Sequence, residues 1–144
     1  MPLDITPAAP ADLPGIIALL DASQLPRAGI EDHVASTLVA RQDAGVVATA
    51  ALELYGGAAL LRSVAVATAL RGQGLGAALT VAALDLARRC GVQTVYLLTE
   101  TAGRFFPRFG FQATSRAEVD IAVRASTEFT TACPQSAMVM VKQL

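Results

Sequence analysis

The sequence has few of the residues that build metal sites and disulfide frameworks. Among its 144 residues there are two cysteines, one histidine and no tryptophan. Cys90 and Cys133 stand 43 positions apart, a spacing typical of neither a zinc site nor a disulfide-stapled domain. We therefore expect no bound metal and a reduced, cytoplasmic protein.

Long apolar runs and an excess of basic charge are missing as well. The longest uncharged stretches, 72–84 and 129–141, have 13 residues each, whereas a transmembrane helix needs roughly 18. Eleven Lys and Arg stand against 12 Asp and Glu, so no surplus of positive charge attracts nucleic acid. The first residues lack the basic and apolar regions of a signal peptide. We expect neither a membrane nor a nucleic acid as partner.

The sequence is rich in the hydrophobic residues that form a protein core. Hydrophobic residues make up 53% of the chain and charged residues 16%, which is typical of a globular domain rather than a disordered one. We find no linker, repeat or low-complexity segment. The sequence therefore predicts a single domain over residues 1–144.

The first half of the chain predicts mainly strands. Residues 3–6 suggest a short strand, and the apolar stripe over 13–20 predicts a helix that Gln24-Leu25-Pro26 ends. A weaker helix is predicted over 29–36. Three strand-like runs follow, over residues 37–41, 46–54 and 58–66. Short glycine-containing turns join each run to the next, which favours an antiparallel meander.

The second half predicts a helix between two strands. Gly91 is placed to end a helix over 75–90, and residues 94–98 follow as a buried strand. A short helix near 101–106 and a last strand near 137–142 complete the pattern. The sequence thus predicts an α/β (α+β) domain, with a mixed, mostly antiparallel sheet of six to seven strands, helices on both faces and a central β-α-β unit. The stripe that predicts the long helix is Leu75, Leu79, Ala82, Leu86 and Cys90.

A glycine-rich loop before the long helix predicts an anion-binding site. Gly72, Gly74 and Gly76 remove side chains where a backbone must come close to a ligand. The helix N-terminus offers free N–H groups and the positive end of the helix dipole, and Arg71 adds a charge suited to phosphate. We interpret residues 71–77, which also include Gln73 and Ala77, as a pyrophosphate site. The alternative is a strand-to-helix turn without a ligand.

A dinucleotide site is a competing interpretation of the same loop. Gly72-x-Gly74-x-x-Ala77 fits the dinucleotide fingerprint, and Glu100 follows the next strand, where a ribose-binding acid belongs. Against this, the glycines come after about 70 residues of predicted hairpins, and 67 residues after Ala77 are too few for the remaining β-α-β units. A nucleotide P-loop is disfavoured because its Lys-Ser/Thr end is missing.

The loop and its surroundings resemble the GNAT N-acetyltransferase superfamily. Arg71-x-x-Gly74-x-Gly76 after the run Leu61–Val66, together with the segment Ala102–Phe111 and its Gly110-Phe111 pair, matches the signatures of that family. Four further segments resemble, more narrowly, the arsenic-resistance-operon acetyltransferases: 60–66, 97–102, 105–106 and 133–137.

The resemblance implies an enzyme that takes acetyl-CoA as co-substrate and acetylates a small-molecule amine, such as an amino-acid-like arsenic or phosphorus toxin of the arsinothricin or phosphinothricin type. It implies that the strand carrying Val64, Ala65 and Val66 splays from its neighbour and pairs with the pantetheine arm. Phe106 occupies the position where many relatives have a proton-donating Tyr, so we expect it to pack against the cofactor. The family is also compatible with a homodimer.

Catalysis requires a neutral amine, and hence a base. Glu53 is the first candidate, with a solvated strand-end charge as its alternative; Glu100 is the second, with a role at a helix N-terminus as its alternative. For the leaving thiolate, either no acid is used, or water or another hydroxyl, with Ser63 as the candidate, supplies the proton.

Arg62 is a candidate ligand for a substrate carboxylate, arsinate or phosphinate, or else part of a structural ion pair. Thr99 is a candidate substrate-side residue, or else a C-cap or a surface residue. Segment 116–136, including Cys133, carries no motif that assigns it a role. Two other functions stay open: a non-catalytic acetyl-CoA sensor and a dinucleotide-binding oxidoreductase.

Overall fold

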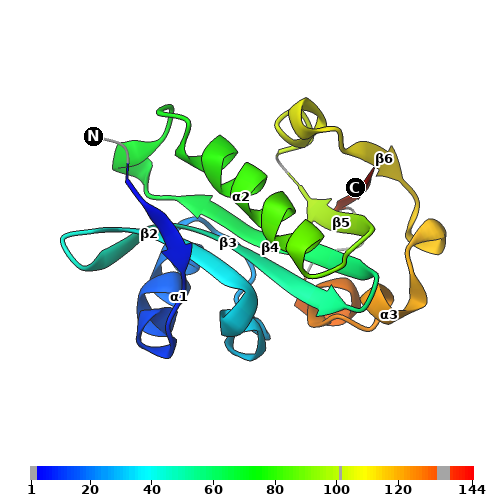
Figure 1. Cartoon of the computed structure of the whole chain (residues 1–144), viewed down its shortest axis with the longest axis horizontal. Helices are drawn as coiled ribbons and strands as arrows, with labels where there is room; N and C mark the ends of the chain where they lie inside the picture. Colours follow the sequence, from blue (N-terminus) through cyan, green and yellow to red (C-terminus); the bar gives the residue numbers. More distant parts are fainter. Residues whose placement is uncertain (1–2, 101, 133–136) are drawn as a thin grey trace.

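The computed structural model describes residues 3–100, 102–132 and 137–144. A seven-stranded sheet runs through the molecule in the order β1-β2-β3-β4-β5-β7-β6 (Figure 1). Among the strands of the described residues, β4 and β5 run parallel and the other neighbouring pairs run antiparallel. The strands are β1 (Ile5–Pro7), β2 (Thr37–Gln42), β3 (Gly45–Tyr55), β4 (Ala58–Val66), β5 (Thr94–Thr99), β6 (Gln112–Thr114) and β7 (Met138–Gln143).

This sheet confirms the predicted fold class and excludes the dinucleotide-binding fold. A doubly wound dinucleotide domain needs a largely parallel sheet built from successive β-α-β units. Here a single β-α-β unit, β4-α2-β5, is inserted into antiparallel neighbours. The oxidoreductase alternative is therefore wrong.

Helices cover both faces of the sheet, as Figure 1 shows. One face packs against α1 (Leu13–Ala22) and the other against α2 (Leu75–Arg89). Alternate residues of a strand serve the two sides: Leu38 and Ala40 of β2 belong to the α2 core, whereas Val39 belongs to the α1 core. Shorter helical segments are Pro10–Asp12, Ile30–Ser36, Thr68–Leu70, Phe106–Phe109, Arg116–Glu118, α3 (Ile121–Arg124) and a π-helical turn at Glu128–Ala132.

The buried side of α2 differs from the predicted stripe. Leu79 is buried as expected, but Cys90 is exposed, and Leu75 and Leu86 are only half-buried. Leu75, Ala82 and Leu86 still pack against the edge of the core, whose buried strand residues in β2, β3 and β4 are leucines and alanines. Gly91 ends α2 with φ of +80°, as predicted. The side chains of α2 that are buried are Leu79, Thr80, Ala83, Leu84 and Ala87.

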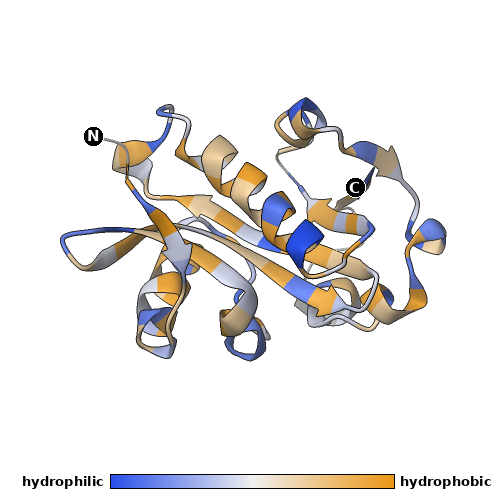
Figure 2. Ribbon diagram, viewed as in Figure 1, coloured by the Kyte–Doolittle hydropathy of each residue, from blue (hydrophilic) through white to orange (hydrophobic). Residues whose placement is uncertain are grey.

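Apolar residues follow the central strands and the inner sides of the helices, and polar residues gather at the turns (Figure 2). A third cluster packs the segment after β6 against the α1 side of β4, β5 and β7 through Val119, Val123 and Phe129. In the described residues, no helix is long and apolar enough to cross a membrane. The core therefore has three parts, and the end of β4 and β5 lies where they meet.

Candidate functional site

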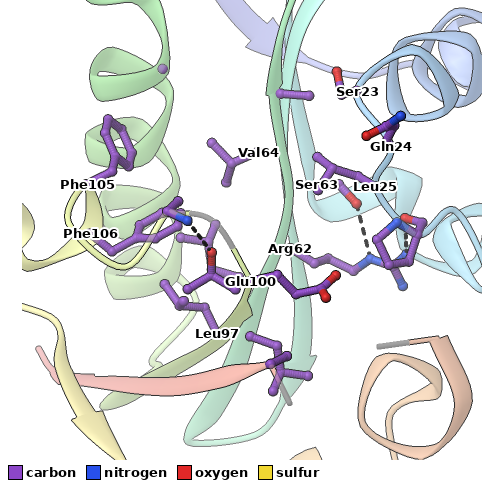
Figure 3. Close-up of a pocket in the computed structure, with 18 of the residues that line it drawn as sticks. Ser23, Gln24, Leu25, Arg62, Ser63, Val64, Leu97, Glu100, Phe105 and Phe106 are labelled. Atoms are coloured by element: carbon purple, nitrogen blue, oxygen red, sulfur yellow. Dashed lines mark hydrogen bonds between the residues drawn. The ribbon is translucent and has the colours of Figure 1, made fainter. Parts of the chain in front are cut away.

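The central feature of the site is a gap between the two parallel strands. Pairing of β4 with β5 stops at Leu61 and Leu97, yet β4 continues to Val66 and β5 to Thr99. A cleft of about 610 Å³ opens between the diverging ends (Figure 3). Its walls come from the end of α1, β4, the α2 N-terminus, β5 and the segment after β5, and they include Ser23, Gln24, Leu25, Pro26, Arg62, Ser63, Val64, Ala65, Val66, Arg71, Gly76, Thr99, Glu100, Phe105, Phe106 and Glu128.

A bulge in β4 forms one wall of the cleft. Ala51 of β3 stands opposite Arg62, but Thr49 stands opposite Ala65, so β4 carries one extra residue. Ser63 takes a positive φ of +60°, a conformation that costs a non-glycine residue about 1–3 kcal/mol. The bulge reverses the alternation: Leu61 and Val64 both pack on the α2 side, and Ala65 packs on the α1 side. The bulge, with its strained backbone at Ser63, thus turns the backbone of residues 63–66 toward the cleft.

The glycine loop lies at one end of the cleft, with its donors free. Gly72 and Gly74 have φ of +80° and +83°, and the space in which their Cβ atoms would stand is open. The first backbone bond of α2 runs from the N–H of Ala78 to the carbonyl of Gly74, so the N–H groups of 75–77 have no partner within the helix. Arg71 stays close because its Nε donates to the carbonyl of Val66 at 3.0 Å. Of the loop residues predicted to bind pyrophosphate, Arg71 and Gly76 line the cleft, Gly72, Gln73 and Gly74 are exposed, and Ala77 is half-buried.

Two phenylalanines form the opposite wall. Phe105 and Phe106 pack edge to face with their centroids 5.0 Å apart, and both line the cleft. Phe106 also contacts Phe111 in the core, at 5.9 Å between centroids, and only 7% of it is exposed. This wall is apolar, and neither ring can donate a proton.

A buried ionic network lies at the other end of the cleft. The side chain of Arg62 is 0% exposed. Its Nη1 donates to the carboxylate of Glu53 at 2.8 Å and to the carbonyl of Ala28 at 2.9 Å. Nη2 donates to the carbonyl of Pro26, and Nε donates to Oγ of Ser63 at 3.1 Å. On the same side, Nε lies 3.4 Å from Oε2 of Glu128.

The carboxylate of Glu53 is fixed inside this network. Its side chain is 1% exposed, so the alternative of a solvated charge is wrong. Burial raises the pKa of Glu53, but hydrogen bonds from Ser126, Tyr55 and Arg62 outweigh it and hold the pKa below its usual range. Glu53 is absent from the cleft walls. Its surroundings hold it as an anion in contact with Arg62, and a role for Glu53 as the base stays a prediction.

The other predicted residues lie along the walls. Ser63 is buried, and its hydroxyl accepts the Arg62 bond described above. Thr99 lies at the end of β5, where its hydroxyl accepts a hydrogen bond from the N–H of Ala102 at 2.9 Å. This bond holds the start of the turn that follows and is not a C-cap, and contact of Thr99 with a substrate stays a prediction. Glu100 is exposed and points its carboxylate into the cleft in Figure 3. Cys133 lies outside the described residues.

Sequence reasoning missed two parts of the wall. Residues 23–26 were interpreted only as the end of a helix, and Glu128 stood in a segment with no assigned role. The one signal in the sequence for residues 23–26 is Pro26. Proline ends the helix in an irregular turn, and the backbone carbonyls of such a turn can accept hydrogen bonds from a side chain. Their place in the cleft depends on contacts between residues 34 to 66 positions apart, from Arg62 to Ala28, Pro26 and Glu128.

The arrangement has three chemically distinct zones. Free N–H groups and Arg71 at the glycine loop suit an anion. The unpaired edge of β4 suits an extended chain that adds to a sheet. The ionic network beyond suits a small polar molecule. In the described residues, no cluster of three or more His, Cys, Asp or Glu side chains is arranged to hold a metal ion.

Comparison with known families gives a match over more than half of the chain. A family model described as an acetyltransferase (GNAT) domain matches residues 33–113. None of the curated proteins compared with this sequence matches it.

Solved structures share the whole fold. N-acetylglutamate synthase from Neisseria gonorrhoeae, complexed with coenzyme A and N-acetyl-glutamate, superposes with a TM-score of 0.84 at 23% identity; the match covers 100% of this chain but only 35% of that one. Rv2747 from Mycobacterium tuberculosis, in complex with CoA and NLQ, has a TM-score of 0.82 at 25% identity over 98% of this chain and 99% of the other. An acetyltransferase from Streptococcus agalactiae has a TM-score of 0.76 at 20% identity, covering 99% and 98%.

Proposed function

The chain belongs to the GNAT acetyltransferase family, and from this premise we propose that it transfers the acetyl group of acetyl-CoA to the primary amine of a small molecule. The observation that carries the proposal is the parting of β4 from β5 beside the glycine loop. A gap with an anion site at one end and a free strand edge along its side fits a molecule with a pyrophosphate and an extended amide arm.

The cofactor is proposed to lie along β4. Its pyrophosphate would meet the N–H groups of residues 72–77 and the guanidinium of Arg71. The pantetheine arm would pair with the edge formed by Val64, Ala65 and Val66. Phe106 would pack against the arm near the thioester. Acetyl-CoA is the co-substrate that this family uses.

The reaction follows from these positions. The lone pair of a neutral amine attacks the thioester carbonyl carbon, a C–N bond forms and the C–S bond breaks. A backbone N–H at the bulge would stabilise the developing oxyanion. The amine loses two protons in all when it starts as an ammonium; one returns to the thiolate and one leaves to solvent. With Phe106 at the usual Tyr position, Ser63 or water would protonate the thiolate, whose basicity is close to that of cysteine, pKa about 8.5.

The acceptor is proposed to be an amino acid or an amino-acid-like toxin with an arsenic or phosphorus oxyacid group. The proposal is supported by the short segments that resemble those of arsenic-resistance acetyltransferases, and by the N-acetyl-glutamate complexed with the Neisseria enzyme. Arg62 lines the cleft, but its hydrogen bonds occupy most of its five donors, so the buried ion pair is its main role. At most one Nη2 donor is left for an acceptor oxygen.

A sensor that binds acetyl-CoA without turnover is the second candidate, since the Phe106 wall offers no proton donor. Residence in the cytoplasm and assembly as a homodimer stay predictions.

Calorimetric titration with acetyl-CoA, with NADH as control, tests the cofactor; thiol release against a panel of amines tests the reaction. The panel holds glutamate, glutamine, phosphinothricin and arsinothricin. We expect binding of acetyl-CoA alone and thiol release with at least one amine. Binding without release on every amine would favour the sensor, and no binding would overturn the proposal.

A further inference from the structure

A basic patch lies at the glycine-loop end of the cleft. It consists of three exposed arginines, Arg71, Arg104 and Arg108. The sequence has no Asp or Glu in residues 67–84 or 101–117, so the two segments that carry the patch bring positive charge alone. The ion pairs found among the described residues involve none of these three arginines. A cluster of exposed charges of one sign at the mouth of a cleft favours a ligand of opposite charge.

Two aromatic rings hold Arg108 in its place. Its guanidinium carbon lies 5.5 Å from the ring centroid of Phe105 and 5.7 Å from that of Phe109, and the two rings pack on each other with their centroids 5.1 Å apart. Stacking uses the face of a guanidinium and leaves the N–H donors at its edge directed away from the rings. It also restricts a long side chain, so less conformational entropy is lost when those donors bind a ligand.

Phe105 connects Arg108 to the proposed pyrophosphate site. A Cβ atom on Gly76 would stand 3.8 Å from Cζ of Phe105, and Figure 3 shows the ring beside the helix. A single ring therefore separates the guanidinium of Arg108 from the first turn of α2. Arg71 lines the same cleft from the end of β4, so two arginines from distant segments lie at this end.

The course of the proposed cofactor makes this end its adenosine end. Pantetheine and adenosine leave the pyrophosphate in opposite directions, because each is bonded to a different phosphate. The pantetheine arm is proposed to run inward along Val66, Ala65 and Val64, so the adenosine lies outside the cleft, beyond the loop. In CoA the ribose of this adenosine carries a 3′-phosphate, a monoester with a charge of about −1.5 to −2 at neutral pH.

We propose that Arg108, stacked on Phe105 and Phe109, binds the 3′-phosphate of CoA and so makes the protein selective for CoA over its 3′-dephospho form. The inference rests on the proposed function and adds to it a second anion site, distinct from the pyrophosphate site at residues 71–77. A planar guanidinium offers a phosphate two parallel N–H donors. Arg104, four residues before Arg108, adds to the local positive charge.

The test compares the calorimetric affinities of the protein for CoA and for 3′-dephospho-CoA, which differ only in the 3′-phosphate. We expect the wild type to bind CoA about tenfold more tightly or better, the gain typical of a charge-assisted hydrogen bond. In Arg108→Gln the affinity for CoA should fall about tenfold and that for 3′-dephospho-CoA less than about twofold, so that the preference disappears. Arg108→Lys, which keeps the charge but not the two parallel donors, should retain part of the preference.

Arg89→Gln is the matched control. It removes the same charge from an exposed arginine at the other end of α2, about 21 Å from Leu75 at 1.5 Å per residue. This variant should keep the wild-type preference for CoA.

The use of two ligands separates binding of the 3′-phosphate from a structural role of the stacked arginine. A variant that only loosens the wall at Phe105 would bind both ligands more weakly by the same factor, and that result would overturn the inference. A wild type that binds the two ligands equally well would overturn it too, while leaving the proposed function intact. If the wild type, shown to be folded by thermal denaturation, binds neither ligand, the proposed function fails and the inference with it.

Discussion

Arg62 joins segments of the chain that are far apart in sequence. Its guanidinium contacts β3 through Glu53, the turn after α1 through Pro26 and Ala28, and the last third of the chain through Glu128. None of these contacts is visible in the sequence. A buried ion network of this kind gives little net stability when intact, but removing one member leaves an uncompensated charge.

We predict that Arg62→Ala lowers the free energy of unfolding by about 3–5 kcal/mol, because Glu53 and Glu128 remain buried with like charge. Urea denaturation measures the change. The control is Arg88→Ala, which breaks the 3.1 Å surface pair with Asp85, where both side chains are about half exposed; it should change stability by at most about 1 kcal/mol. Equal losses in the two variants would contradict the burial of the network.

Acid should weaken the fold through Glu53. Because its pKa is depressed in the folded protein, its contribution is fully present above the ordinary Glu pKa of about 4.3 and is lost as the pH falls through the lower folded value. Asp12, whose pKa is lowered chiefly by the hydrogen bond from Arg41, acts in the same direction. We expect urea midpoints to fall below about pH 5. Tyr55→Phe removes one donor to Glu53, so its stability should be lower at neutral pH and fall less steeply in acid.

The phenol of Tyr55 should lose its proton at a higher pH than an ordinary tyrosine. Burial, followed by its hydrogen bond to Glu53, raises its pKa to about 12. The stability linked to this shift is present below the ordinary Tyr pKa of about 10 and is lost as the pH rises through the folded value. Tyrosinate absorbance, compared between wild type and Tyr55→Phe, measures it. A difference spectrum that titrates near pH 10, at about the ordinary value, would contradict the contact with Glu53.

Among the elements, the glycine loop before α2 allows the effect of a mutation on cofactor binding to be distinguished from its effect on stability. We predict that Gly74→Ala weakens acetyl-CoA binding at least tenfold, since a methyl group would occupy the open space at the loop and strain a φ of +83°. Gly56→Ala, in the β3–β4 turn at φ of +68°, also has open space around it and carries the same backbone cost, about 1–2 kcal/mol. Gly56→Ala is therefore the matched control. It should lose a similar amount of stability, while its affinity for acetyl-CoA, measured by calorimetry, should be unchanged. Unchanged affinity in Gly74→Ala would contradict the pyrophosphate site.

The elements predicted from sequence were those with a strong local pattern. The strands β2 to β5, the helix α2 and the αL glycine after it lie within a residue or two of their predicted ends. The three-residue strand β6 and the helix α3 were missed, because segments this short show no periodicity. The short helix predicted at 101–106 lies later, at Phe106–Phe109. The loop residues were found because glycine spacing is local, whereas the roles of Glu53 and Glu128 depend on packing across the molecule.

For the molecule as a whole, the cleft divides the sheet into two parts that meet along the paired half of β4 and β5. A ligand in the gap contacts both parts, so it binds the folded state alone. At about 100 times its dissociation constant, acetyl-CoA should add about 2.7 kcal/mol, or roughly 5–10 °C in melting temperature for a domain of this size. Thermal scans with acetyl-CoA and, as control, NADH measure this. A shift with NADH of equal size would contradict the specificity of the cleft.

The parting of β4 and β5 also places a free strand edge in the interior of a protein. Free edges on the outside of a sheet attract other chains and promote aggregation. Here the paired strands below, Phe105 and Phe106 on one side and residues 23–26 on the other limit access. The edge is therefore enclosed by the fold itself, and the walls that border the proposed cofactor site are the same walls that separate this edge from other chains.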